Sequence, residues 1–262
     1  MPVSTSETRF PTTPSFRLDG KRALVTGASR GLGRAIAIAF AEAGAEVLLA
    51  ARALEEMERT VQHLASCGLP PARAVPLDVT DRAAVRRTVA ELGPFDILLN
   101  NAGTNIREPF LEVKDESLDA LIDLNIRSAV TVAQSVARGM VDAGRPGAII
   151  NLSSVNGHVA GINRSVYTAT KHAIEGLTKA MAAELGPKGI RVNALCPTFI
   201  ETPLTAGVLS DPAFRDRAVR AIPLGRLGEV EDVMGAAVFL ASPAAALING
   251  ASLLIDGGMT CL

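Results

Sequence analysis

Short apolar runs alternate with longer amphipathic segments from Lys21 almost to the end of the chain. The apolar runs are nearly continuous instead of alternating with polar residues, which is typical of parallel strands covered on both faces. This pattern predicts strands at Arg22–Thr26, Glu46–Ala51, Arg73–Leu77, Phe95–Asn100, Ala148–Leu152, Arg191–Leu195 and Ser252–Ile255.

Amphipathic segments between these runs predict helices, the clearest at Gly33–Ala43, Leu54–Ser66, Glu116–Val141 and Ser165–Leu185. Alternating strands and helices indicate an α/β fold with a doubly wound parallel sheet of the Rossmann type and right-handed crossovers. The 262 residues, 48% of them hydrophobic, contain no repeat or interdomain linker after residue 16. We therefore expect a single domain with a sizeable core.

Two stretches depart from this alternation. Residues 1–15 are rich in Ser, Thr and Pro and lack the basic start and apolar stretch of a secretory signal. They are expected to form a disordered tail ahead of a domain at residues 16–262. Thr198–Leu224 holds three prolines and predicts one short helix near Ala213–Ala221. Long insertions of this kind are often lids or binding loops.

The composition gives no sign of nucleic-acid, membrane or metal binding. Lys and Arg number 26 against 27 Asp and Glu, which gives no reason to expect nucleic acid or a membrane surface as partner. No apolar run approaches the roughly 18 residues of a membrane span. Three scattered cysteines, Cys67, Cys196 and Cys261, fit a reducing compartment, so the cytoplasm is expected. The three histidines show no metal-binding spacing, and no metal site is predicted.

A glycine-rich loop lies between the first predicted strand and the first predicted helix. Its sequence, Thr26-Gly-Ala-Ser-Arg-Gly-Leu-Gly33, spaces three glycines as G-x-x-x-G-x-G. Such glycines let a pyrophosphate approach the peptide N–H groups at a helix N-terminus, whose partial charge is positive. The alternative is a βα turn whose glycines only allow tight packing.

A tyrosine and a lysine one helical turn apart are the candidate acid–base groups. Tyr167 and Lys171 share one helix face, and Ser154 lies 13 residues before the tyrosine (167 − 154). The lysine ammonium is expected to lower the pKa of Tyr167 below its ordinary value near 10, and Ser154 to stabilise negative charge on a substrate oxygen. Taken alone, such a pair is more often part of an ordinary helix surface than of an active site. Ser153 is the alternative serine, and the 13-residue offset to the tyrosine favours Ser154.

These motifs together resemble the short-chain dehydrogenase/reductase family. The matching pieces appear in order over nearly the whole chain: Thr26–Gly33, Asp78-Val79, Asn100–Gly103, Asn125, Ser154, Tyr167-x-x-x-Lys171, and Pro197 with Thr202. The resemblance implies an oxidoreductase that transfers a hydride between a nicotinamide and a carbonyl or secondary alcohol. It implies the catalytic set Asn125, Ser154, Tyr167 and Lys171, with Asn125 anchoring a water that relays protons past Lys171.

The resemblance also assigns the cofactor site, with Asp78 and Val79 at the adenine and Pro197, Ile200 and Thr202 at the nicotinamide. Thr198 replaces the glycine that usually follows this proline. The full predicted set is Gly27, Ser29, Arg30, Gly31, Leu32, Gly33, Arg52, Asp78, Val79, Asn101, Ala102, Gly103, Tyr167, Lys171, Pro197, Ile200 and Thr202.

The end of the second strand bears on the choice of cofactor. Enzymes that use NAD usually carry an acid here for the ribose hydroxyl, whereas NADP enzymes use an arginine near the 2′-phosphate. Ala51 stands at this position, followed by Arg52, and Arg30 is a second candidate for a phosphate clamp. The residues favour NADP(H), with NAD(H) as the alternative.

Substrate residues are expected among Ser154, Asn156, His158 and Arg164, with Asn163 and Arg107 nearby. This mixture suits a small polar or anionic substrate. The runs Asn100–Arg107 and Ile222–Gly228 resemble those of sugar-acid dehydrogenases of the gluconate type, and also those of 3-oxoacyl-carrier-protein reductases. A non-catalytic cofactor sensor or a scaffold protein on the same fold are alternatives from other classes.

The assembly expected is a homotetramer, although the resemblance allows a homodimer. Glu116–Val141 and Ser165–Leu185 carry more apolar surface than one sheet face can cover, and in the family such helices pair between subunits. The last strand, Ser252–Ile255, is expected at a second interface.

Overall fold

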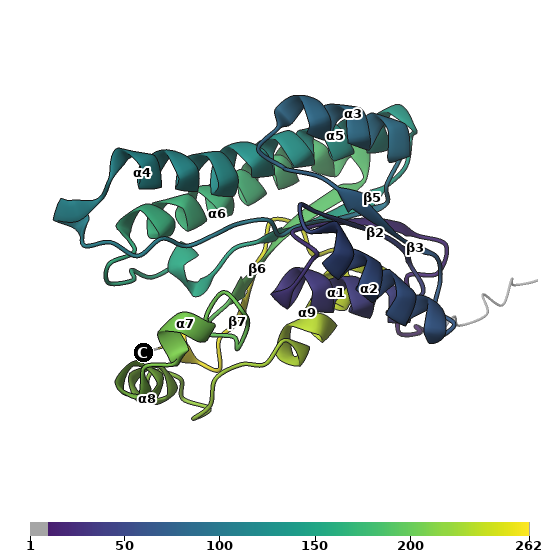
Figure 1. Ribbon diagram of the computed structural model, residues 1–262. Coiled ribbons are helices and arrows are strands. Elements are labelled where there is room, and N and C mark those ends of the chain that lie inside the picture. The colour runs from purple at the N-terminus through teal and green to yellow at the C-terminus, as the bar shows by residue number, and fades with distance from the viewer. Residues whose placement is uncertain (1–9, 262) are drawn as a thin grey trace, which may run out of the picture.

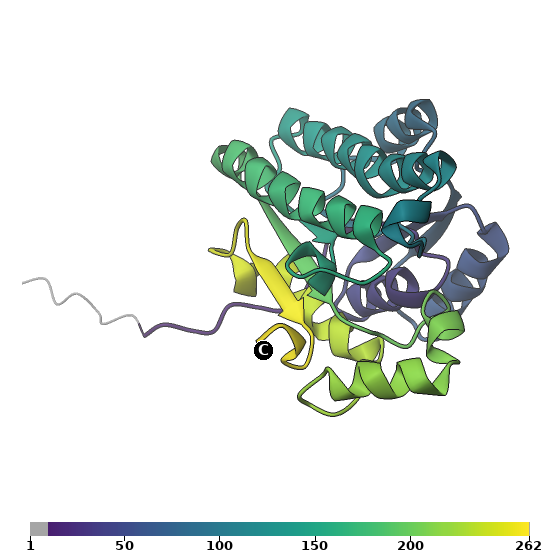
Figure 2. The ribbon, with the colours of Figure 1, turned by 90° about the vertical axis from the view of Figure 1, so that its left-hand side faces the viewer.

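The computed structural model describes residues 10–261. Their strands form one parallel sheet in the order β3-β2-β1-β4-β5-β6-β7 (Figures 1 and 2). The strands are β1 Arg22–Thr26, β2 Glu46–Ala51, β3 Ala72–Pro76, β4 Ile97–Asn100, β5 Gly147–Leu152, β6 Ile190–Pro197 and β7 Ser252–Ile255. The predicted doubly wound, Rossmann-like fold is confirmed.

Helices cover both faces of this sheet (Figure 1). One face carries α1 (Gly31–Glu42), α2 (Leu54–Ser66) and α9 (Glu231–Ala241). The other carries α3 (Arg82–Leu92), α4 (Asp115–Ile122), α5 (Ser128–Asp142) and α6 (Ser165–Leu185). Two short helices, α7 (Ala206–Leu209) and α8 (Pro212–Arg220), lie outside the two layers.

Successive strand residues enter two separate cores. In β1, Val25 packs in the core that contains Phe40 of α1, whereas its neighbour Leu24 packs with Val136 and Met140 of α5. Because side chains alternate across a strand, both faces need apolar residues when both are covered. This burial explains the nearly continuous apolar runs.

Strand ends differ by a few residues from those expected. The largest extension is in β6, which continues to Pro197, two residues beyond the predicted end. The cause is β7, which pairs with Ala194–Pro197 and so prolongs the ladder at the carboxyl end. Pro197 and its neighbours are thereby held next to the end of β5.

The long helix predicted at Glu116–Val141 is interrupted. A π-helical turn, Asp123–Arg127, separates α4 from α5. Single π turns inside helices are frequent at functional sites. Here the turn contains Asn125, whose side chain is buried.

The irregular stretch Thr198–Leu224 contains two helices instead of one. The predicted helix is α8, where Asp211 accepts a hydrogen bond from the Ala213 N–H at 3.0 Å and Pro212 occupies the first turn. The preceding α7 was not predicted. The segment has a small core of its own, made by Leu209, Ala218, Ile222 and Leu227.

The predicted tail, residues 1–15, lies mostly outside the described residues. Residues 10–15 are exposed and form neither helix nor strand. Contact with the domain begins where the Ala244 N–H donates to the Ser15 carbonyl at 3.1 Å and the Phe16 ring lies 6.0 Å from that of Phe239. Within residues 10–261, no helix combines the length and apolar character needed to cross a membrane.

Candidate active site

A cleft of about 1470 Å³ runs along the carboxyl ends of the strands. Every predicted cofactor residue lines it, as do Ser154, Tyr167 and Lys171 of the predicted catalytic set. Parallel sheets bind ligands in this location because the chain leaves each strand there and continues into a loop. The segment that holds α7 and α8 contributes Leu204, Val208 and Phe214 to the opposite wall.

The glycine loop at one end of the cleft packs closely against itself and against Asn101. A Cβ atom at Gly33 would lie 2.4 Å from the Gly27 carbonyl oxygen, and one at Gly27 would lie 2.7 Å from the Asn101 amide. Helix α1 begins at Gly31, and the side chain of Arg30 makes no capping hydrogen bond. The first N–H groups of the helix are therefore available to an anion, which fits the pyrophosphate of a dinucleotide.

Asn101 joins the end of β4 to this loop. Its side-chain amide donates to the Thr26 carbonyl at 2.8 Å, and the Asn101 and Ala102 N–H groups reach the Thr26 hydroxyl at 3.0 and 3.2 Å. The asparagine thus holds the glycine loop in place and also lines the cleft.

Two arginines stand at the end of the cleft where the adenosine is predicted to bind. Arg30 and Arg52 both line the cleft and are exposed, and within residues 10–261 neither forms an ion pair. Asp78 accepts hydrogen bonds from the Thr80 N–H and hydroxyl, which lower the pKa of its carboxyl, with a smaller contribution from Arg52. Two guanidinium groups without partners fit a ribose phosphate better than a bare hydroxyl.

Tyr167 and Ser154 meet at the centre of the cleft. Tyr167 lies in the first turn of α6 and is partly exposed. Burial raises the pKa of its phenol, while Ser154 and then Arg164 act in the opposite direction. The expected fall in the pKa of Tyr167 caused by Lys171 is therefore not present in the free protein, because desolvation penalises the phenolate more than its neighbours stabilise it.

Lys171 is buried below Tyr167 with its ammonium directed at the end of β5. Its Nζ donates to the Leu152 carbonyl at 2.8 Å and lies 5.6 Å from the centroid of the Tyr167 ring. Burial lowers the pKa of Lys171 to about 8, against the effect of Cys196 and Glu175 behind it. Burial, followed by the charge of Glu175, raises the pKa of the Cys196 thiol.

Asn125 does not line the cleft. Its side-chain oxygen accepts from the Thr104 N–H at 2.9 Å, and its amide donates to the Thr104 carbonyl and to the Thr170 hydroxyl at 2.9 and 3.1 Å. Thr170 in turn donates to the Tyr167 carbonyl at 2.7 Å. The Asn125 side chain therefore connects the π turn with the start of α6.

Arginines and phenylalanines form the far end of the cleft. The Arg164 guanidinium lies 5.4 Å from the centroid of Phe199, and that of Arg107 lies 4.9 Å from Phe214. The two rings make an edge contact at 5.6 Å. Burial, followed by Arg107, lowers the pKa of Arg164, and the Arg164 Nε is buried with no hydrogen-bond partner. Within the described residues, neither guanidinium has an ion-pair partner.

Only some of the predicted substrate residues lie in the cleft. Asn156 and Arg164 line the cleft. His158 and Asn163 do not: the His158 Nε2 lies 3.7 Å from Glu175 on the other side of the loop, and Asn163 takes a positive φ of 56° and accepts from the Glu108 N–H. Phe199 and Phe214 lie in the Thr198–Leu224 segment, which was expected to form a binding loop, although neither was singled out. Each ring packs on one of the two arginines.

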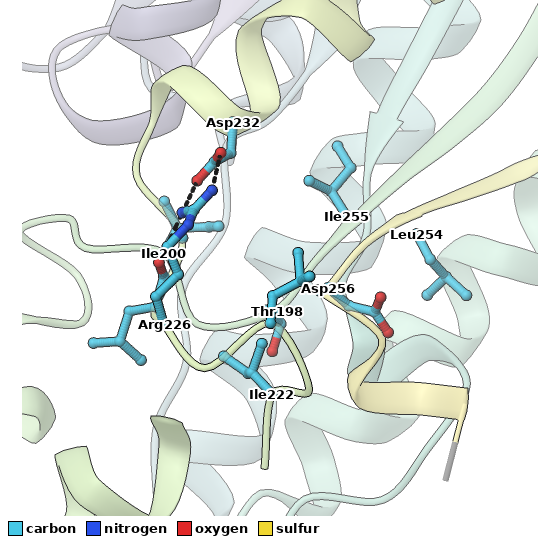
Figure 3. Close-up of a pocket in the computed structure, with 12 residues that line it drawn as sticks. Thr198, Ile200, Ile222, Arg226, Asp232, Leu254, Ile255 and Asp256 are labelled. Atoms are coloured by element: carbon cyan, nitrogen blue, oxygen red, sulfur yellow. Dashed lines mark hydrogen bonds and ion pairs between the residues drawn. The ribbon is translucent and has the colours of Figure 1, made fainter. Parts of the chain in front are cut away.

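Thr198 borders both the cleft and a smaller hollow of about 240 Å³, whose lining is drawn in Figure 3. Its N–H donates to the Ile255 carbonyl at 3.2 Å and its hydroxyl to the Met259 sulfur at 2.8 Å. Across the hollow, Arg226 forms a double hydrogen bond to Asp232 at 2.6 and 2.7 Å. These contacts hold the base of the segment that carries α7 and α8, and Met259 completes the cleft wall.

Comparison with known proteins identifies relatives over nearly the full length. A family model described as enoyl-(acyl carrier protein) reductase matches residues 27–260. Gluconate 5-dehydrogenase of Gluconobacter oxydans (strain 621H) is 43% identical, over 94% of this chain and 96% of that protein. L-xylulose reductase of Bos taurus is 41% identical, over 93% and 98%.

Solved structures agree with these relatives. A gluconate 5-dehydrogenase from Burkholderia cenocepacia J2315, in complex with NADP and tartrate, superimposes with a TM-score of 0.90 at 39% identity, covering 94% of this chain and 98% of that one. A short-chain type dehydrogenase/reductase from Mycobacterium marinum gives a TM-score of 0.89, also at 39% identity and with the same coverage.

The titration of Tyr167 can be followed directly, because it is the only tyrosine and the chain has no tryptophan. In the protein without ligands we expect its pKa above the ordinary value near 10, since burial has the largest effect. Arg164→Met should raise it further, whereas Arg220→Met, at an exposed position on α8, should leave it unchanged. Near-ultraviolet phenolate absorbance against pH measures it; a midpoint below 10 would contradict the expectation.

Proposed function

The chain belongs to the short-chain dehydrogenase/reductase family, and we propose that it interconverts a secondary alcohol and a ketone on a sugar acid, with NADP(H) as the cofactor. It is an oxidoreductase that acts on CH–OH groups of small polar substrates, as its relatives are dehydrogenases and reductases of this kind. The sugar-acid substrate rests on the chain's own arginines.

The observation that carries this substrate class is the pair Arg107 and Arg164 beside Tyr167. Arg164 is half-buried, and its pKa is lowered by burial and by Arg107, so both guanidinium groups gain from a bound anion. A carboxylate forms short, paired hydrogen bonds with a guanidinium. The planar faces of Phe199 and Phe214 hold the two groups toward the cleft.

Tyr167 is proposed to exchange the proton with the substrate oxygen. Its raised pKa keeps the phenol protonated at neutral pH, ready to donate to an alkoxide as a ketone is reduced. Ser154, whose hydroxyl already accepts from the Asn156 N–H at 3.2 Å, keeps its own proton to donate to the same oxygen. The nicotinamide, when bound, supplies or accepts the hydride.

Lys171 and Asn125 are proposed to support this exchange. Lys171, now bonded to the Leu152 carbonyl, is placed to hold the nicotinamide ribose and to favour the phenolate when an alcohol is oxidised. Both N–H bonds of the Asn125 side-chain amide are donated, to Thr104 and Thr170, and its oxygen already accepts from Thr104, so its backbone is proposed to anchor a water for the proton relay.

We expect the protein to bind NADPH more tightly than NADH, because Arg30 and Arg52 flank a position where Ala51 provides no acid. Arg52→Asp should weaken NADPH binding about 100-fold, as a charge-assisted pair is lost and a repulsion gained, and should reverse the preference. Fluorescence titration of both cofactors measures this, with Arg34→Asp on the same cleft wall as the control. Tighter NADH binding by the unaltered protein would refute the assignment.

A substrate panel tests the function itself. Gluconate and 2-deoxygluconate should be oxidised, while pentitols and 3-oxoacyl thioesters should be poor substrates. Arg164→Met should raise the KM of the acid about 10- to 100-fold and change the KM of any neutral polyol little, since only the acid loses a charge-assisted hydrogen bond. Arg220→Met is the matched control.

Two results of this panel would overturn the proposal. Equal loss for acid and neutral substrates in Arg164→Met would mean that the arginine is structural, and turnover of neutral sugars or thioesters alone would assign another substrate. NADPH binding with no turnover of any panel member would favour a cofactor sensor.

A homotetramer, working in the cytoplasm, is the assembly and location proposed. Strand β7 is an edge of the sheet, with Leu254 39% exposed, and Leu247 in the turn before this strand is almost fully exposed. Exposed Leu118 and Val130 lie on the α4–α5 side, so two separate apolar surfaces are present.

Three cysteines without disulfides fit a reducing compartment. The oxidoreductase domain is proposed to occupy residues 16–262.

If the tetramer is held by two different interfaces, we expect that breaking one of them leaves dimers. Leu254→Arg should convert the tetramer to dimers, because a charge cannot be buried at the β7 edge without a partner. Ala65→Arg, at an exposed position on α2, should leave the tetramer intact. Light scattering after size exclusion measures both. A wild-type monomer at micromolar concentration would contradict the proposal.

A further inference from the structure

Three side chains with metal-binding chemistry meet behind the catalytic serine. His158 comes from the loop after the short 3-10 turn Val155–Gly157, Glu175 from α6 and Cys196 from β6. One ligand atom from each lies within 4.8 Å of the other two. The proposed reaction uses none of them.

The contacts inside this cluster are already close to those of a metal site. The Cys196 thiol donates to Glu175 Oε1 at 3.2 Å, and His158 Nε2 lies 3.7 Å from Glu175 Oε2. Two ligands about 2.1–2.3 Å from a tetrahedral zinc ion lie roughly 3.4–3.7 Å apart. The Ser252 hydroxyl donates to Glu175 Oε2 and borders the same space.

We propose that Cys196, Glu175 and His158 bind one divalent transition-metal ion of the zinc type. A thiolate, a carboxylate and a neutral imidazole together carry two negative charges, which neutralise the ion in a largely buried site. Binding replaces the S–H bond of Cys196 with an S–metal bond and releases that proton to solvent. The fourth position is left to water or to the Ser252 hydroxyl.

The proposed metal site is buried on two sides and open to solvent on the third. Glu175 and Cys196 are buried, whereas the His158 side chain is 31% exposed and opens one side to solvent. The loop reaches the carboxylate only because residue 157 is glycine: a Cβ there would lie 2.9 Å from Glu175 Cγ. The site is separate from the cleft, since none of the three ligands lines it.

The site is also next to the catalytic groups. Glu175 follows Lys171 by one helical turn and opposes the lowering of its pKa by burial. His158 follows Ser154 by four residues, with the 3-10 turn between them. A bound ion would therefore join β6, α6 and the Ser154 loop at a place that supports the cleft without entering it.

Cobalt is the probe for this site, because a thiolate–Co²⁺ bond gives a charge-transfer band and a tetrahedral ion gives strong visible bands. Purified full-length protein is stripped with a chelator and titrated with Co²⁺ and then with Zn²⁺. We expect saturation at one Co²⁺ per chain, bleaching by Zn²⁺, and release of the thiol proton, seen as a buffer-dependent heat in calorimetry.

Variants separate this site from adventitious binding. Cys196→Ser should abolish the thiolate band, and His158→Asn should weaken Co²⁺ binding at least about 10-fold. The control is Cys67→Ser, which removes an exposed cysteine whose sulfur lies 4.0 Å from the His63 Nε2 on α2. It should leave the band unchanged. NADPH binding and thermal unfolding confirm that each variant is folded.

The result that overturns the proposal is equally specific. A thiolate band that survives Cys196→Ser but disappears in Cys67→Ser would assign the metal to the surface pair on α2. No saturable binding by folded wild-type protein would show that His158, Glu175 and Cys196 form a hydrogen-bonded cluster and nothing more. A loss in Cys196→Ser that His158→Asn does not reproduce would remove the histidine from the site.

Discussion

Parallel pairing of the strands is the constraint on which the rest of this structure depends. It brings the carboxyl ends of β1, β4, β5 and β6 to one edge, although they are separated by up to 171 residues (197 − 26). The bonds from Asn101 to Thr26 then tie two of these ends together. The glycine loop, Ser154 and Pro197 border one cleft for this reason, and not through any local sequence relation.

Charge is distributed very unevenly with respect to this cleft. The chain as a whole has a net charge of −1. Nevertheless, Arg30 and Arg52 line one end, Lys171 the middle, and Arg107 and Arg164 the other end, all without an ion-pair partner in the part of the chain described. Cations left in this state favour anionic ligands, and those proposed for this cleft are a phosphate at one end and a carboxylate at the other.

Desolvation, more than mutual attraction, sets the state of the central pair in the free protein. Burial raises the pKa of Tyr167 and lowers that of Lys171 to about 8, so both groups are pushed toward their neutral forms. Cys196 and then Glu175 oppose this at the lysine, and Ser154 and then Arg164 oppose it at the tyrosine. The electrostatic balance of the site is therefore open to change by any charge that enters the cleft, which is a useful property for proton exchange.

The sequence by itself determined the order of strands and helices, the glycine loop and the helical spacing of Tyr167 and Lys171. Each of these depends on local periodicity or on backbone requirements that residue types report directly. Only the tertiary structure decided that a π turn would take Asn125 away from the cleft, and that His158 would face Glu175 and not the substrate. Side-chain direction in a turn or loop depends on which distant elements pack against it, and no spacing along the chain records those contacts.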